Sequence, residues 1–79
     1  MQVLEIIATD LKSQSWAVAT HASITRSRGA RRIASETWRE LADELRRKRV
    51  DPADVKFSRM GDLYYFIVAE NMESVADKT

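Results

Sequence analysis

The longest hydrophobic pattern in the chain has a helical period and runs from Ser27 to Arg49. Its apolar side chains recur at spacings of three and four residues, which places them on one face of a helix. These positions are Ala30, Ile33, Ala34, Thr37, Trp38, Leu41, Ala42 and Leu45. Asp51-Pro52 follows the pattern, and proline cannot continue a helix. The sequence therefore predicts one long amphipathic helix over 27–49.

Four other stretches have the composition or the alternation of β-strands. They are Val3–Thr9, Trp16–Ala22, Val55–Arg59 and Leu63–Glu70. Polar turn residues over Asp10–Ser15 predict a loop between the first two strands. The last two strands flank Met60-Gly61-Asp62, where Gly61 can adopt a positive φ, so they are expected to form a hairpin.

The resulting order of elements is ββαββ, which predicts an α+β fold. We expect a four-stranded antiparallel sheet with the one long helix packed on one face, in a single domain over residues 1–70. Residues 71–79 show no strong pattern and are expected to form a C-terminal tail. One helix cannot cover both faces of such a sheet, so an apolar face is expected to remain for a homodimer or another partner.

Composition limits the classes of protein to consider. The chain has 79 residues, which is one small domain, and it has no cysteine, which excludes disulfides and thiolate metal sites. Thirteen Lys and Arg against twelve Asp and Glu give a net charge of +1, so the whole molecule is neither strongly basic nor strongly acidic. No apolar run approaches the roughly 20 residues that cross a bilayer, and the start of the chain lacks the pattern of a signal peptide. We therefore expect a cytoplasmic protein with no membrane partner.

The sequence lacks the usual groupings of catalytic residues. His21 is the only histidine, and it has no cysteine or suitably spaced carboxylate with which to form a metal site. The only glycines are Gly29 and Gly61, so the sequence has no glycine-rich phosphate loop. We expect a protein that is not an enzyme and that holds no cofactor or metal.

Four arginines crowd the start of the predicted helix. They are Arg26, Arg28, Arg31 and Arg32. The positive end of the helix dipole disfavours cations there, and the four charges repel one another, so the cluster is expected to cost stability. Such a cluster favours binding to a polyanion or to an acidic protein surface, because the guanidinium group pairs with phosphate and with carboxylate alike. The alternative is a surface that only keeps the protein soluble.

A second candidate surface lies on the predicted hairpin. Tyr64 and Phe66 share one face of their strand, and Lys56 and Arg59 lie on the neighbouring strand. Aromatic residues at alternate positions of an open sheet, flanked by basic residues, can stack the bases of a single-stranded nucleic acid. The alternative is that Tyr64 and Phe66 fill the core or a dimer interface.

The stretch Ala30-Arg31-Arg32-Ile33-Ala34-Ser35, followed later by Gly61-Asp62-Leu63-Tyr64, resembles small phage anti-CRISPR proteins that inhibit type I CRISPR surveillance complexes. In those proteins two short strands precede the helix that the motif opens, and a hairpin with a glycine turn follows it. The resemblance implies a stoichiometric inhibitor that occupies a nucleic-acid groove of its target with basic side chains. By position, Arg31 and Arg32 would carry that role.

The leading hypothesis is therefore a phage-encoded, non-enzymatic inhibitor that docks on a subunit of a CRISPR effector complex and blocks access to target DNA. Its partner-binding residues would be the four arginines together with Lys56, Arg59, Tyr64 and Phe66. The alternative is a small nucleic-acid-binding regulator of a phage or mobile element, whose affinity would fall with salt. A third hypothesis is a protein that binds its partner through the uncovered sheet face.

Overall fold

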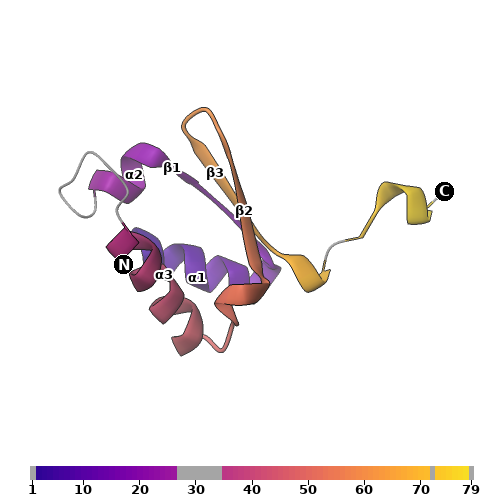
Figure 1. The fold of residues 1–79 in the computed structure, drawn as a ribbon, viewed down its shortest axis with the longest axis horizontal. Helices are drawn as coiled ribbons and strands as arrows, with labels where there is room; N and C mark the ends of the chain where they lie inside the picture. Colours follow the sequence, from indigo (N-terminus) through magenta and orange to yellow (C-terminus); the bar gives the residue numbers. More distant parts are fainter. Residues whose placement is uncertain (1, 27–34, 72, 79) are drawn as a thin grey trace.

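The computed structural model describes residues 2–26, 35–71 and 73–78. In chain order the elements are α1 (Val3–Gln14), β1 (Trp16–Thr20), α2 (His21–Arg26), α3 (Ser35–Arg47), the 3-10 turn η1 (Pro52–Asp54), β2 (Val55–Met60), β3 (Leu63–Val68), and the 3-10 turns η2 (Ala69–Asn71) and η3 (Val75–Lys78) (Figure 1). The described residues form an α+β fold with three α-helices and one three-stranded antiparallel sheet. The expected four-stranded sheet with one long helix is therefore wrong.

The first element is a helix and not the expected strand. Its buried side chains follow the i, i+3, i+4, i+7 spacing of a helical face. They are Leu4, Ile7, Ala8 and Leu11. Because this stripe continues through residues 10–14, one helix replaces both the predicted strand and most of the predicted loop. The helix ends at Ser15, whose φ of 70° is left-handed and whose N–H donates to the Leu11 carbonyl at 3.1 Å.

Two further helices are present where the sequence predicted the end of a strand and one long helix. Trp16–Thr20 is a strand as expected, but the chain turns into α2 at His21. α3 begins at Ser35 and ends at Arg47, inside the predicted helix over 27–49. The first part of that prediction, residues 27–34, lies outside the described residues.

The predicted hairpin is confirmed as β2 and β3. Gly61 takes a φ of 61° in its turn, and Met60 pairs with Leu63 on either side of that turn. β3 is the middle strand of the sheet, because β1 also pairs with it in the order β1–β3–β2. The sheet therefore joins the N-terminal part of the chain to the hairpin.

Gly61→Ala is expected to lower the free energy of unfolding by about 1–2 kcal/mol, because a residue with a Cβ is strained at a left-handed φ. No heavy atom lies within 4 Å of the position that this Cβ would take, so backbone strain accounts for the loss. Urea denaturation followed by tryptophan fluorescence measures it. Gly61→Asn is the control, because asparagine tolerates this conformation, and equal losses in the two variants would contradict the explanation.

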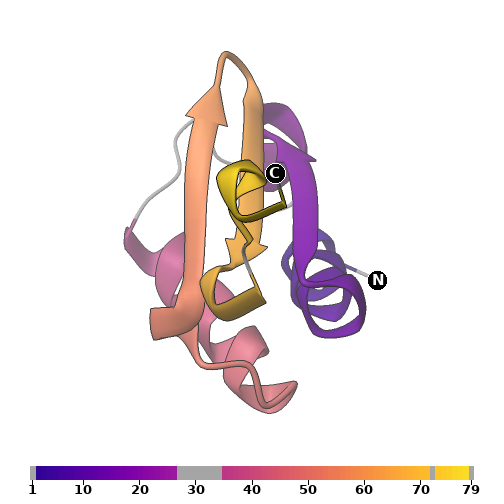
Figure 2. The ribbon, with the colours of Figure 1, turned by 90° about the vertical axis from the view of Figure 1, so that its right-hand side faces the viewer.

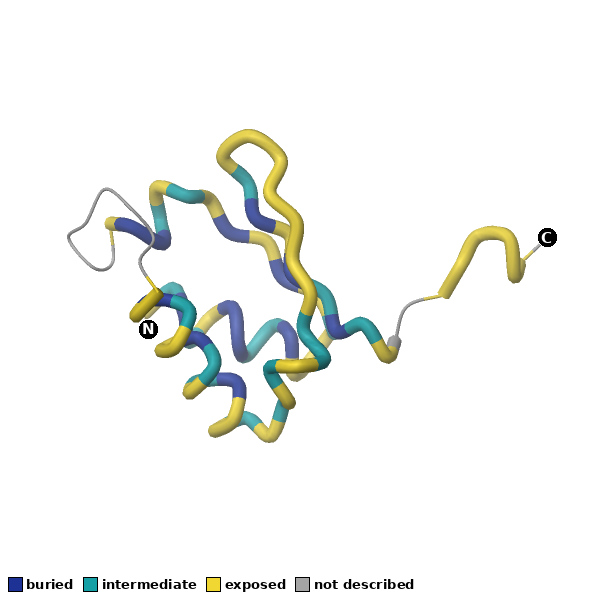
Figure 3. Tube along the Cα trace, viewed as in Figure 1, coloured by how far each residue is buried: buried dark blue, intermediate teal, exposed yellow. Residues whose placement is uncertain are grey.

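The core lies between the sheet and two helices, α1 and α3, which are side by side on one sheet face (Figure 1 and Figure 2). Ala17 and Ala19 of β1 are buried, and their small side chains let α1 approach the sheet. Tyr64, Phe66 and Val68 of β3 fill the same face. Figure 3 accordingly shows the buried positions along the helices and the strands, whereas the hairpin tip and residues 73–78 are exposed.

Candidate functional site

α3 divides its charged side chains between two edges. Its buried face is centred on Leu41. Successive residues of a helix turn by about 100°, so Arg39 and Arg46 project from the outward face of α3, roughly 140–160° from Leu41 and on the same flank as Trp38, the residue that contacts the hairpin. The other edge carries Glu36, Glu40 and Glu44, of which Glu40 and Glu44 line a pocket shared with α1. α3 thus has an arginine edge (Arg39 and Arg46) on its outward face, on the flank of the hairpin, and an acidic edge (the three glutamates) on the flank of α1.

Two ion pairs lie within α3. Arg46 donates to Asp43 Oδ1 at 3.1 Å, and Arg47 donates to Glu44 on the acidic edge. Both arginine side chains are more than half exposed, so water screens these pairs. Because such pairs contribute little to stability, Arg46 can leave Asp43 for another anion at small cost.

An aromatic cluster joins the arginine edge of α3 to the hairpin. The Trp38 ring stacks on Phe57, with centroids 4.7 Å apart, and meets Tyr64 edge-on at 5.9 Å. The Arg59 guanidinium lies over the Tyr64 ring, 5.3 Å from its centroid. This cation–π contact holds Arg59 on the helix side of the hairpin. A shallow apolar hollow of about 160 Å³ runs between α3 and the hairpin beside these rings.

We call this surface the α3–hairpin groove. It consists of Trp38 and Phe57, which line the hollow, and of the arginines on the neighbouring outward face of α3 (Arg39 and Arg46) and on β2 (Arg59). Half of the Phe57 side chain is exposed, although it stacks on Trp38, so an aromatic surface lies open between the arginines. Guanidinium groups beside an exposed ring can bind phosphate and stack on a planar group at the same time.

The dipole argument for the arginine cluster does not hold for the described residues. The first turn of α3 carries Glu36 and its last turn carries Arg46 and Arg47, which is the favourable order of charges. Arg26 is the last residue of α2, where a cation is likewise favourable. Arg28, Arg31 and Arg32 lie outside the described residues, and their role stays a prediction.

Tyr64 and Phe66 point into the core, where they are 5% and 2% exposed, so their rings do not form a surface platform. The strand register separates the two basic residues that were grouped with them. Arg59 pairs with Tyr64 on the helix side of the sheet, whereas Lys56 projects from the opposite side. Tyr64 nevertheless supports the groove, because it lies under Arg59 and its hydroxyl is 3.4 Å from His21 Nδ1.

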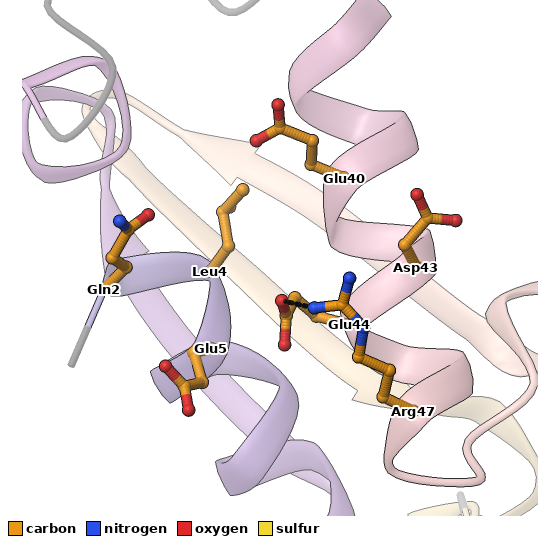
Figure 4. A pocket seen from close by; sticks show the side chains of 7 residues that line it. All are labelled: Gln2, Leu4, Glu5, Glu40, Asp43, Glu44 and Arg47. Carbon is orange, nitrogen blue, oxygen red and sulfur yellow. Dashed lines mark hydrogen bonds and ion pairs between the residues drawn. The ribbon is translucent and has the colours of Figure 1, made fainter.

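A polar pocket of about 450 Å³ lies between α1 and the acidic edge of α3 (Figure 4). Its lining consists of Gln2, Leu4, Glu5, Glu40, Asp43, Glu44 and Arg47. Within the described parts of the chain, no group of three or more His, Cys, Asp or Glu is placed to hold a metal ion. The lining carries four carboxylates and one guanidinium group, so this is the side of α3 that a polyanion would avoid.

Comparisons with protein-family models, with curated proteins and with solved structures found no match to this chain. Across residues 2–26, 35–71 and 73–78, no helix is both long enough and apolar enough to cross a bilayer. The function is therefore argued from the surfaces of this chain alone.

Proposed function

We propose that this protein is a nucleic-acid-binding domain and that it contacts its ligand with the α3–hairpin groove. The observation that carries the proposal is the separation of charges on α3, which places Arg39 and Arg46 on the outward face of the helix, on the flank of the hairpin that carries Arg59. A phosphate backbone lying along the groove would meet these three cations and remain away from the acidic edge.

The order of elements supports the same function. The α-helices and strands follow the order helix, strand, helix, helix, strand, strand, and β1 lies beside β3. The same order is found in helix-turn-helix domains that are followed by a β-hairpin wing. In helix-turn-helix proteins the second helix of the pair lies against the nucleic acid, and α3 would correspond to it by its place in the order of elements. This likeness is one of element order alone, which does not determine function, and the side chains of the groove are the support for nucleic-acid binding.

The charge of the whole molecule predicts the kind of binding. A net charge of +1 gives little long-range attraction, so affinity depends on the few cations that touch phosphate. Such binding weakens steeply with salt, because each phosphate contact releases counterions. Arg26 at the end of α2 and the nearby Arg28, Arg31 and Arg32 in the sequence would add to these contacts.

The anti-CRISPR-like inhibitor stays a prediction. Two of its arginines, Arg31 and Arg32, lie outside the described residues, and the helix-start argument that favoured it does not apply to α3. An inhibitor that docks on an acidic protein surface would use arginines without binding free nucleic acid. Titration with free nucleic acid therefore separates the two functions.

Fluorescence anisotropy with a labelled mixed-sequence DNA duplex tests the proposal. With three phosphate contacts, raising salt from roughly 50 to 200 mM is expected to lower affinity by about 40-fold. Arg39→Glu with Arg59→Glu is expected to weaken binding by at least about tenfold and to flatten the salt dependence.

Lys12→Glu with Lys78→Glu is the matched control, because it makes the same change in net charge on α1 and in the tail, away from the groove. Its affinity is expected to stay within about threefold of the unchanged protein, because charges beyond a Debye length of roughly 10 Å are screened. Equal losses in the two double variants would contradict the proposed site. Absence of binding to duplex DNA, single-stranded DNA and RNA at low salt would overturn the proposed function.

A further inference from the structure

The sheet face that points away from α1 and α3 is apolar and exposed. Alternate residues of the three strands form it, because the register places Trp16, Ile67 and Lys56 in one row and Val18, Tyr65 and Ser58 in the next. We call this surface the open sheet face and define it by Trp16, Val18, Lys56, Met60, Tyr65 and Ile67. The side chains of Trp16, Val18, Met60 and Tyr65 are 52%, 42%, 66% and 40% exposed. A soluble domain rarely leaves so many large apolar groups together in water without a partner for them.

The open sheet face has a hollow, and the face is about as long and as wide as one α-helix. The hollow has a volume of about 440 Å³, and Trp16, Val18, Lys56, Tyr65 and Ile67 contribute to its lining. Three strands are about 10–14 Å wide and six residues long, which is roughly 20 Å. One α-helix of about 13 residues has that length and a diameter of about 10 Å. Helices already pack on the other face of this sheet, so a helix here would complete a layered arrangement.

The charges of the face favour another protein over a second copy of this chain. Lys56 is its only side chain that is charged at neutral pH, and none of the outward-facing residues of the three strands is an aspartate or a glutamate. Two copies packed face to face would bury two Lys56 side chains, and neither copy would supply a carboxylate for them. Burial of an unpaired charge is strongly unfavourable, whereas an acidic side chain on a partner would pair with Lys56.

The single cation also argues against nucleic acid as the occupant. Trp16 and Tyr65 could stack bases, but proteins that bind single strands add a basic groove that follows the backbone. Arg59 of the hairpin projects from the opposite face of the sheet, and the arginines of α3 belong to a helix that packs on that opposite face. The open sheet face therefore has the apolar part of such a site without its basic part.

We infer that the open sheet face binds an amphipathic α-helix of another protein, one with an apolar stripe and an Asp or Glu beside it that pairs with Lys56. The stripe covers Trp16, Val18 and Tyr65, and the acidic residue lies over the β2 edge. The inference does not depend on the proposed nucleic-acid function, because the α3–hairpin groove is on the other side of the sheet. A protein with both surfaces would hold a partner and a nucleic acid together.

A displayed peptide library tests this inference. The library presents helices of roughly 16 residues with apolar residues fixed at i, i+3, i+4 and i+7 and with Asp, Glu, Lys, Arg, Ser and Ala randomised beside them. Selection on the unchanged protein is expected to enrich Asp and Glu at one flanking edge. The same selection on Lys56→Glu is expected to enrich Lys and Arg at that edge.

A synthetic peptide of the most enriched sequence then locates the site. Trp16→Ser is expected to weaken its binding by at least about tenfold, as removal of a central aromatic anchor does. Ile6→Ser is the matched control, since Ile6 is an exposed apolar residue (42%) of α1 outside the face, and its binding is expected to stay unchanged. Circular dichroism of each variant verifies that the fold is kept, and Val18→Ser replaces Trp16→Ser if that variant unfolds.

Four outcomes would overturn the inference. The first is a selection that enriches no peptide sequence. The second is a selection that enriches peptides without a preference for Asp or Glu at the flanking edge, or one in which Lys56→Glu does not change that preference to Lys and Arg. The third is a dimer in sedimentation at roughly 100 μM that Trp16→Ser dissociates, which would assign the face to a second copy. The fourth is binding of an oligothymidine that Trp16→Ser abolishes, which would assign the face to single-stranded nucleic acid.

Discussion

Leu11→Ala is expected to lower the free energy of unfolding by about 2–5 kcal/mol, because alanine leaves a cavity at a site that cannot fully close. Leu11 is 1% exposed and lies in the last turn of α1, within the core between that helix and the sheet. Domains of this length have a total stability of roughly 4–12 kcal/mol. The variant is therefore expected to lose much of its resistance to denaturant.

Ile6→Ala is the control from the same helix. Ile6 is 42% exposed, so its replacement is expected to cost less than about 1 kcal/mol. Urea denaturation followed by far-UV circular dichroism compares the two variants directly. The comparison also tests the helix itself, because a strand over 3–9 followed by a loop would make Leu11 tolerant and leave the two variants alike.

Phe66→Ala is expected to lower the free energy of unfolding by about 3–5 kcal/mol. Phe66 is 2% exposed on the middle strand, and its ring centroid lies 5.8 Å from Phe57 and 6.4 Å from Trp38. Its removal would empty the centre of the core and leave the rings of the α3–hairpin groove without support. The nucleic-acid affinity of this variant is expected to fall as the fraction of folded protein falls.

Phe57→Ala is the matched control for Phe66→Ala. The Phe57 side chain is half exposed, so its stacking on Trp38 is the main contact that it loses, worth about 0.5–1.5 kcal/mol beyond the area it buries. Thermal unfolding followed by circular dichroism measures both variants, and anisotropy titration at a temperature where both are folded measures their affinity. A larger loss of stability in Phe57→Ala than in Phe66→Ala would contradict the described core.

The hairpin was predictable because its signals are local. Leu63–Val68 is rich in aromatic and β-branched residues, and Gly61 provides the positive φ of the turn that precedes it. The alternation of its faces was predicted as well, with Tyr64, Phe66 and Val68 on one side. Which side would be buried depends on where the helices pack, and a sequence pattern within one strand does not contain that information.

α1 was missed because a short apolar stretch fits two periods. Val3–Thr9 has enough apolar residues on both faces to resemble a buried strand. The deciding residue is Leu11, which continues the helical stripe beyond the stretch but was assigned to a loop because polar residues surround it. A longer window over 3–14 would have favoured the helix.

The candidate site was predicted only in part. Arg59 lies in the α3–hairpin groove, but Arg39 and Arg46 were not among the predicted partner-binding residues. A helical projection of α3 was available from the sequence and separates these arginines from the glutamates. It could not show which edge faces the hairpin, because that depends on the contact between Trp38 and Phe57, residues 19 positions apart.

The position of residues 73–78 has a practical consequence for measurement. These residues are exposed, and Figure 1 shows them leading away from the helices and the sheet. A biotin or a fluorophore coupled after Lys78 would therefore tether the domain to a sensor chip through a segment outside the core. An immobilised layer made in this way would permit sequential injection of oligonucleotide and peptide on the same molecules.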